Sequence, residues 1–373
     1  MLVMAVLLLA GTAFLTISST EDQIAHNQAA SAHALLSAEA GLHRAIARLS
    51  ADATYAGETG VPLGSGTASI GVSTAAQQVC LSKDLDVVAS VAVRGGQAQS
   101  RIRATADQAI YPFRWSLFAA NGPLILSSLD ASASPRSGVD SYDSRLGPYD
   151  AVVNGGGRAN VGARGSGVIL ANVDLLGGAA GEWVTSSPTA ATHLGRAGET
   201  PVPLAEPSAT WSDDPNVEAG GTLTLAPGTH YYTSLTLGND ARVLAASGPV
   251  TLYVRGNVEA GNNVVIGAEP GEKPLLVTNS GTGALSTFRT GEDFHLYGGL
   301  YGTNTNVVLG DRTIIHGSVI GRRISGPLSS WEDGPCCNQK APTVHFDRAM
   351  TNRAVCTHSA FSIRRGTWRE IFP

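Results

Sequence analysis

A short acidic segment in the middle of the chain offers the clearest set of possible metal ligands. Its carboxylate and amide oxygens are the kind of ligand that Ca²⁺ takes. The spacing does not match an EF-hand loop, and the proline within the segment fits an ordinary solvated turn equally well. A weak calcium site and a solvated loop both stay open as interpretations, and we expect no resident metal. The candidate ligands are Asp213, Asp214, Asn216 and Glu218.

The later part of the chain carries histidines and carboxylates but no catalytic motif. It has no Gly-x-Ser-x-Gly elbow, no His-Glu-x-x-His pair and no phosphate-binding glycine loop. A strand histidine is more often hydrogen-bonded or on the surface than catalytic, and a carboxylate pair for glycoside hydrolysis is defined by a spatial separation. We therefore expect a protein without enzyme activity, catalytic residues or cofactors. The strand histidines are His230, His295, His316 and His345, and a loose acidic set comprises Asp140, Asp143 and Asp150.

The chain contains four cysteines, three of them near its C-terminus. An even number of cysteines behind an export-like N-terminal segment favours one or two disulfides. Free buried thiols are a second interpretation. A zinc site with His345 or His358 is a third, although the two-residue gap typical of zinc-binding cysteine pairs is missing. The disulfide candidates are Cys80, Cys336, Cys337 and Cys356.

Composition points to β-structure with many turns. The chain has 373 residues, of which 44 are glycine and only 15% are charged, against about 7% glycine and about 25% charge in typical domains. The glycines follow no collagen triplet and separate many short apolar runs, a pattern typical of strands joined by turns. The net charge of -5 provides no basic surface, which excludes nucleic acid as an expected partner.

The first 20 residues contain no charged side chain. A helix of that length spans about 30 Å, the thickness of the hydrocarbon core of a bilayer. The sequence therefore predicts a single membrane-spanning helix, and a cleaved signal peptide is the competing interpretation. The apolar residues that would face lipid or other helices are Leu2, Val3, Val6, Leu7, Leu8, Leu9, Phe14, Leu15 and Ile17.

Residues 21–50 continue the helical pattern without a break. They contain no proline and many alanines, and apolar residues recur every three or four positions. We predict one continuous helix from Leu2 to about Ser50, roughly 75 Å long. Its first half can exchange lipid for helix contacts in a fibre core, and its second half must lie against a folded domain. The packing stripe is Leu35, Ala38, Leu42, Ile46 and Leu49.

Two segments of this helix resemble a known family. Residues 18–27, Ser-Ser-Thr-Glu-Asp-Gln-Ile-Ala-His-Asn, and residues 37–42, Ser-Ala-Glu-Ala-Gly-Leu, look like the N-terminus of PilX-type minor pilins of type IV pili. The pseudopilin that caps the type II secretion pseudopilus has the same layout. The resemblance covers about 50 residues. It implies a subunit anchored in the inner membrane that later joins an extracellular filament through helix contacts with other pilins.

The sequence departs from that family in two ways. No basic residue and glycine precede the apolar run, so we expect that the chain is already mature or that its start is placed late. The apolar stretch also lacks the glutamate with which most major pilins pair the neighbouring N-terminal amine. In this respect the chain resembles minor pilins at a filament tip. The filament system, however, is not specified by the sequence.

The remaining residues predict an α+β protein with a mainly β outer part. We expect a linker and small β unit over 51–115, a parallel β-helix over 116–350 and a C-terminal tail or cap over 351–373. An antiparallel β-sandwich is the alternative fold. Strand–turn–strand segments recur at 237–240, 260–263 and 309–312, where Gly and Asn suit positive φ.

The stretch Leu223–Met350 resembles the Gly/Asn-rich domain found behind PilX-like N-termini in some bacterial surface proteins. The segments that carry this likeness include 225–232, 250–257 and 298–304. The resemblance implies a β-helical fold without known catalysis. We expect a structural minor pilin-like subunit that displays this domain, with a tip adhesin or surface ligand as a further partner. A surface-anchored carbohydrate-binding adhesin or a polysaccharide-acting β-helix enzyme is the alternative function.

Overall fold

The chain divides into two compact units. The computed structural model describes residues 2–371 except 76–79, 94–95, 111, 129–137, 188–191, 195–208, 213–214, 270–272, 279–283, 327–339, 353–354, 357–360 and 365–366. Unit 1 comprises residues 1–110 and 356–373, and unit 2 comprises residues 111–355. Unit 2 is thus inserted into unit 1, whereas the sequence predicted a separate β unit over 51–115 and a C-terminal tail.

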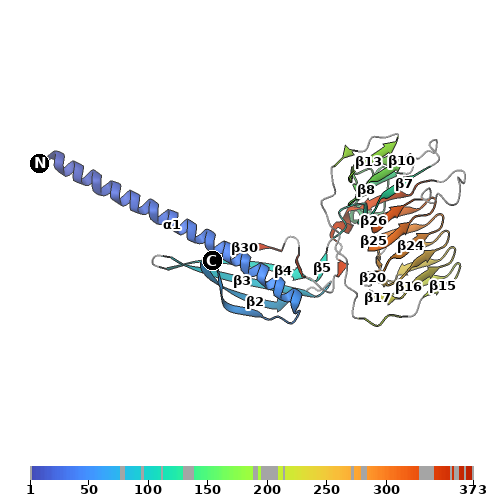
Figure 1. Ribbon diagram of the computed structural model, residues 1–373, viewed down its shortest axis with the longest axis horizontal. Coiled ribbons are helices and arrows are strands. Elements are labelled where there is room, and N and C mark those ends of the chain that lie inside the picture. The colour runs from blue at the N-terminus through green and yellow to red at the C-terminus, as the bar shows by residue number, and fades with distance from the viewer. Residues whose placement is uncertain are drawn as a thin grey trace. The chain divides into compact units, whose positions relative to one another are not determined.

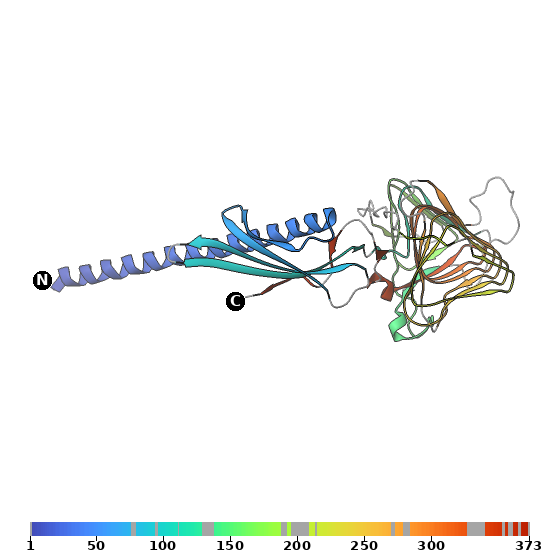
Figure 2. The ribbon, with the colours of Figure 1, turned by 90° about the horizontal axis from the view of Figure 1, so that it is seen from below.

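Unit 1 is a long helix lying on an antiparallel sheet (Figures 1 and 2). The strands show the alternation of apolar and polar residues that leaves one sheet face buried and one exposed. β3 and β4 pair along their full lengths, from Ser82 opposite Asp107 to Val93 opposite Gly96. The elements are α1 (Leu2–Ala51), β1 (Gly57–Leu63), β2 (Gly66–Thr74), β3 (Ser82–Val93), β4 (Gly96–Asp107), β5 (Ala109–Ile110), β29 (Ser362–Ile363) and β30 (Arg369–Ile371). The two-residue strand β28 (Val355–Cys356), which pairs with β5, contains the boundary between the units.

The second half of α1 packs on the buried face of this sheet. Ala38, Leu42 and Leu49 are buried, while Leu35 and Ile46 are partly buried against the same cluster. The helix and sheet approach closely at Gly41, where a Cβ would lie 2.7 Å from Cγ1 of Val87. Small residues on the helix therefore set how deeply it lies on the sheet. The remaining sheet residues of the cluster are Ala68, Ile70, Leu85, Ala89, Ile102, Ala104 and Ala106.

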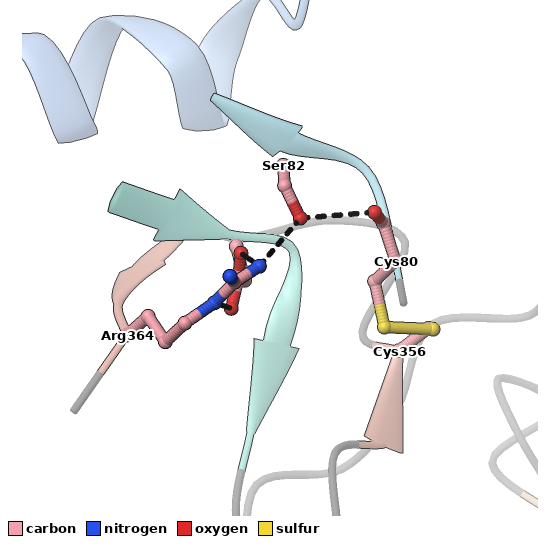
Figure 3. The surroundings of a disulfide bond; sticks show 5 residues. Cys80, Ser82, Cys356 and Arg364 are labelled. Carbon is pink, nitrogen blue, oxygen red and sulfur yellow. Dashed lines mark hydrogen bonds and ion pairs between the residues drawn. A yellow bond between two sulfur atoms is a disulfide. The ribbon is translucent and has the colours of Figure 1, made fainter. Parts of the chain in front are cut away.

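The C-terminal residues return to unit 1 and extend its sheet. β29 and β30 both pair antiparallel with β4. Cys80 and Cys356 form a disulfide with a Cα–Cα distance of 5.5 Å (Figure 3). Beside it, the Arg364 guanidinium donates to both carboxylate oxygens of the buried Asp107 at 2.7 and 2.8 Å. The other two cysteines, Cys336 and Cys337, lie outside the described residues.

Unit 2 is a parallel β-helix. Its 22 described strands belong to one sheet in which each strand pairs in parallel with the strand one coil further on, as β16 pairs with β19 and β19 with β22. The parallel pairing confirms the predicted α+β fold with a β-helical domain and excludes the antiparallel sandwich. Inward aliphatic residues stack from coil to coil and form the core.

The strands of unit 2 fall into two runs. The first run is β6 (Leu117–Ala119), β7 (Leu124–Ser127), β8 (Gly138–Tyr142), β9 (Val161–Ala163), β10 (Val168–Ala171), β11 (Asp174–Leu175), β12 (Gly178–Ala180), β13 (Val184–Ser187) and β14 (Thr192–His193). The second run is β15 (Asn216–Val217), β16 (Thr222–Leu225), β17 (Gly228–Tyr232), β18 (Leu235–Leu237), β19 (Arg242–Ala245), β20 (Val250–Val254), β21 (Val258–Ala260), β22 (Val265–Ile266), β23 (Leu275–Thr278), β24 (Ser286–Thr290), β25 (His295–Val308), β26 (Ile314–Ser325) and β27 (Thr343–Asp347). Single turns of 3₁₀ helix cover Ser144–Leu146 and Arg348–Asn352.

The two runs meet in the middle of the β-helix. β26 pairs with β6 and β7, and β27 pairs with β8, so the last coil of the chain stacks on the first (Figure 1). The first run therefore winds from this joint to one end. The second run starts at the other end and winds back to the joint. We call this contact between β26–β27 and β6–β8 the coil joint.

The recurrent turns are stacked on one another, but the glycines serve a purpose other than the predicted one. Positive φ occurs at the third turn residue, as in Asp240, Asn263 and Arg312. The glycine two positions earlier is needed for close approach, since a Cβ on Gly310 would lie 2.0 Å from the carbonyl oxygen of Gly291 in the next coil. The turns thus select glycine because neighbouring backbones touch.

Candidate functional site

The first surface of interest is the half of α1 that precedes its sheet contact. Every residue from Leu7 to Ala29 is exposed, and Ala30 is the first buried one. Figure 2 shows this half extending past the strands of unit 1. For Leu2, Val3 and Val6 only the helical backbone is described. The large apolar side chains exposed by 59–72% are Leu7, Leu8, Leu9, Phe14, Leu15 and Ile17.

These side chains surround the helix. Successive residues of an α-helix point about 100° apart, so Leu7, Leu8, Leu9 and Ile17 face different directions. A single flat partner covers one face of a helix only, whereas this segment is apolar on all sides. Across the described residues no helix has a stretch long and apolar enough to cross a membrane.

The second site is a column of polar residues on the outer face of unit 2. Tyr297, His316, His345 and Asp140 occupy one register position on β25, β26, β27 and β8. The residue before each points inward and is buried, which fixes the outward direction of the column. We call these four residues the polar column, and it crosses the coil joint between His345 and Asp140.

The contact across the joint is a hydrogen-bonded pair. Nδ1 of His345 lies 2.6 Å from a carboxylate oxygen of Asp140. The hydroxyl of Tyr149 donates to the other oxygen at 2.8 Å, and its ring stacks on His345 with 3.7 Å between centroids. Burial acts to raise the pKa of Asp140, but the hydrogen bonds from His345 and Tyr149 outweigh it and hold that pKa below its usual value.

A buried charged network adjoins the column. Lys273 lies 3.0 Å from Asp347 and 3.4 Å from Glu269, and its ammonium also donates to the Tyr142 hydroxyl. Tyr142 in turn donates to Glu269 at 3.0 Å. Burial acts to raise the pKa of Asp347, but hydrogen bonds from Ser144 and the charge of Lys273 lower it overall. Each of these ionised groups has a partner, so the network can stabilise the joint at neutral pH.

His316 is the exception in this cluster. The residue is only 8% exposed, and its Nδ1 has no hydrogen bond to any described residue. The nearest acidic oxygen is 3.4 Å away on Glu269. Burial, together with the positive charges of His345 and Lys273, lowers the pKa of His316 to about 3. The imidazole is therefore neutral at physiological pH, stacked on Tyr297 at 4.6 Å.

The geometry of the cluster suits a buried structural network better than a cofactor site. Among the described residues no three His, Cys, Asp or Glu side chains are placed to hold a metal ion. Of the calcium candidates, Asp213 and Asp214 lie outside the described residues, while Asn216 and Glu218 are exposed. His230 is partly buried, with its ring 2.8 Å from the Ala226 carbonyl oxygen.

The polar column was not predicted from sequence, although the sequence contains a signal for it. Three coils repeat a buried aliphatic residue followed by an outward polar ring, in Leu296-Tyr297, Ile315-His316 and Val344-His345. Aligning these pairs would have placed the two histidines side by side. Asp140, which completes the column, lies 205 residues from His345 and could not be placed in that way.

Comparisons with known proteins leave the family open. No protein-family model matches the chain, and no curated protein matches it. Among solved structures, the competence-associated pilin ComZ from Thermus thermophilus matches over 92% of this chain and 97% of its own. The sequence identity is 12% and the TM-score is 0.30, and we infer nothing about this chain from that likeness.

Proposed function

We propose that this chain is a structural subunit of a pilus-type filament, assembled through the exposed half of α1. The observation that carries the proposal is the apolar surface between Leu7 and Ile17, which nothing described in the chain covers. Removing each large aliphatic side chain from water contributes about 1.5–3 kcal/mol. A surface of this size therefore strongly favours burial against a partner.

Several helices of the same kind fit this surface better than one folded partner. Leu7, Leu8 and Leu9 point about 100° apart around the axis, so covering them requires neighbours on several sides. A Cβ added at Gly11 would meet no other atom within 4 Å, and the missing side chain leaves room for a close helix neighbour. A core of packed subunit helices provides such neighbours, with the sheet of unit 1 and the β-helix of unit 2 outside it.

The finer form of the proposal is a minor pilin of the PilX type at a filament tip. It is supported by the residue order in 18–27 and 37–42 and by the lack of glutamate within residues 1–20. We further propose that the subunit turns over no substrate. Immunogold labelling tests the position: gold at filament ends supports a tip role, and gold spread along the shaft contradicts it.

A charge inside the apolar surface tests the filament role itself. Leu8→Asp should abolish incorporation into filaments because a carboxylate would have to be buried among apolar helices. His26→Asp is the matched control, since it adds a carboxylate to the same helix near the charged Asp22. Quantitative blotting of sheared filaments measures both variants. Filaments that carry Leu8→Asp at the wild-type level would sink the proposal.

The test also requires that the variant protein folds. Leu8 is 71% exposed and contacts no sheet residue of the unit 1 core, so unit 1 should form normally in Leu8→Asp. Hydrogen exchange of β3 and β4 verifies this directly. A variant that is excluded from filaments while retaining wild-type protection in these strands identifies an assembly defect.

A further inference from the structure

A groove of about 480 Å³ lies on the outer face of unit 2. It is formed by β24, β25, β26 and β7, which follow one another along the β-helix (Figure 1). All of its residues belong to unit 2, so it is independent of α1 and of the filament role. The lining of the groove includes Thr287, Asn306, Arg323, Arg289, Val308 and Ile125.

Strand register arranges the groove in two columns of different chemistry. Thr287, Asn306 and Arg323 share one register position on three successive strands and offer hydrogen-bonding groups. Two residues further along each strand lies the second column, Arg289, Val308, Ser325 and Ile125, whose aliphatic members are Val308 and Ile125. A ligand that fits both columns has one polar edge, has apolar parts that meet Val308 and Ile125, and extends along the axis of the β-helix.

Two arginines in the groove have no anionic partner. Arg289 and Arg323 are exposed, and neither forms an ion pair or hydrogen bond with a described residue. No described acidic residue lines the groove. Glu259 occupies the register position beside Arg289 in the neighbouring coil but does not pair with it. The groove therefore presents two positive charges that a bound anion would neutralise.

The placement of the two arginines suits a polymer. Arg289 and Arg323 lie on strands two apart in the sheet, and adjacent strands are about 4.8 Å apart, so the backbones that carry the two arginines are roughly 10 Å apart along the axis. An extended chain with repeated acidic groups can pair with both arginines at once.

We propose that this groove binds an acidic polysaccharide whose sugar units carry carboxylates. A pyranose ring has hydroxyl edges, which can hydrogen-bond to the column of Thr287, Asn306 and Arg323. Its C–H faces can pack on Val308 and Ile125. The carboxylates pair with Arg289 and Arg323, whose planar guanidinium groups suit such acceptors. Nucleic acid fits less well, because the described groove has no aromatic side chain on which a base could stack.

The experiment measures binding of the full-length chain, held in a non-ionic detergent, to polygalacturonate. Fully methyl-esterified polygalacturonate has the same backbone without charge and is the matched ligand control. The variant Arg289→Gln with Arg323→Gln should weaken polygalacturonate binding at least tenfold. Arg164→Gln with Arg242→Gln removes the same charge from exposed arginines outside the groove and should leave binding unchanged.

A second variant separates the groove from general charge effects. Val308→Glu places a carboxylate in the second column, beside Arg289, at a half-exposed position, and it should abolish binding without unfolding unit 2. Equal binding of the charged and esterified polymers would overturn the proposal. So would an equal loss in the control arginine variant, or tighter binding of DNA or polyglutamate than of polygalacturonate. Each of these outcomes leaves the filament proposal untouched.

Discussion

Units 1 and 2 are both built on sheets, but different interactions hold their strands together. In unit 1 a single helix stripe covers one face of an antiparallel sheet, and a disulfide fixes the returning C-terminal strands. In unit 2 each coil stacks on the next, and a polar column crosses the coil joint. Unit 1 depends on a few contacts between distant elements, whereas unit 2 depends on repetition.

Because their strands are held by different interactions, the two units should be able to unfold separately. A change to the stacking surface should open unit 2 and leave unit 1 intact, and the loss of a long-range link should do the reverse. Because two units need not unfold together, a single unfolding free energy does not describe the chain. Hydrogen exchange followed peptide by peptide reports on each unit separately.

The largest effect is expected from a methyl group between coils. Gly310→Ala places a Cβ 2.0 Å from the Gly291 carbonyl oxygen, so the backbones must separate, at a cost of about 3 kcal/mol or more. Exchange should accelerate in β24–β26 and stay unchanged in β2–β4. Thr236→Ala, at an exposed strand position, is the control. Wild-type protection in Gly310→Ala would show that neighbouring coils accept a methyl group between their backbones without loss of stability.

A smaller effect is expected from removing the covalent link. Replacing both Cys80 and Cys356 by alanine should cost about 2–4 kcal/mol in unit 1. The disulfide closes a long loop, most of which is folded unit 2. It should therefore stabilise unit 1 by less than a disulfide that closes a flexible loop of the same length. Urea unfolding, read from exchange in β4 and β30, measures the change. A loss confined to unit 2 would reverse the comparison.

The smallest effect is a pH dependence confined to unit 2. His316 has a pKa of about 3 in the folded state against an ordinary value of 6.5, so unfolding binds a proton between these two values. Its contribution to stability is complete above pH 6.5 and is lost progressively as the pH falls toward 3. The unit 2 unfolding midpoint should be lower at pH 5 than at pH 7.

A variant without the imidazole isolates this contribution. His316→Phe keeps a ring that stacks on Tyr297 but removes the titrating group, and it should flatten the pH dependence between pH 7 and pH 5. Unit 1 provides the internal control, since its midpoint should not follow His316. An unchanged slope in His316→Phe would assign the acid sensitivity to other groups.

Local patterns in the sequence predicted those parts of the fold that depend on nearby residues. The periodicity from Leu35 to Leu49 indicates which face of α1 meets the sheet, because helix geometry alone sets that face. The alternation in Thr67–Ser73 likewise indicates β2. The Gly-Asn turns predicted coils, although the reason for glycine proved to be backbone contact at positions such as Gly310.

Pairings between distant segments could not be predicted, because sequence patterns report only on nearby residues. The sequence around Leu117 does not identify Val319 as its partner, because both strands have the same pattern of inward aliphatic residues as the other coils. The insertion of unit 2 into unit 1 and the polar column both follow from such pairings. Residues such as Asp140 and His345 acquire their environment only once the coils are in place.

The coil joint also bears on how the protein is made. The strands β6–β8 are synthesised at the start of unit 2, yet their partners β26 and β27 emerge from the ribosome last of all the coils. Until then their edge stays open to pairing with other chains. In unit 1, β4 must likewise wait for β29 and β30. A prematurely terminated chain can complete neither unit, so only a fully synthesised subunit pairs the β6–β8 and β4 edges.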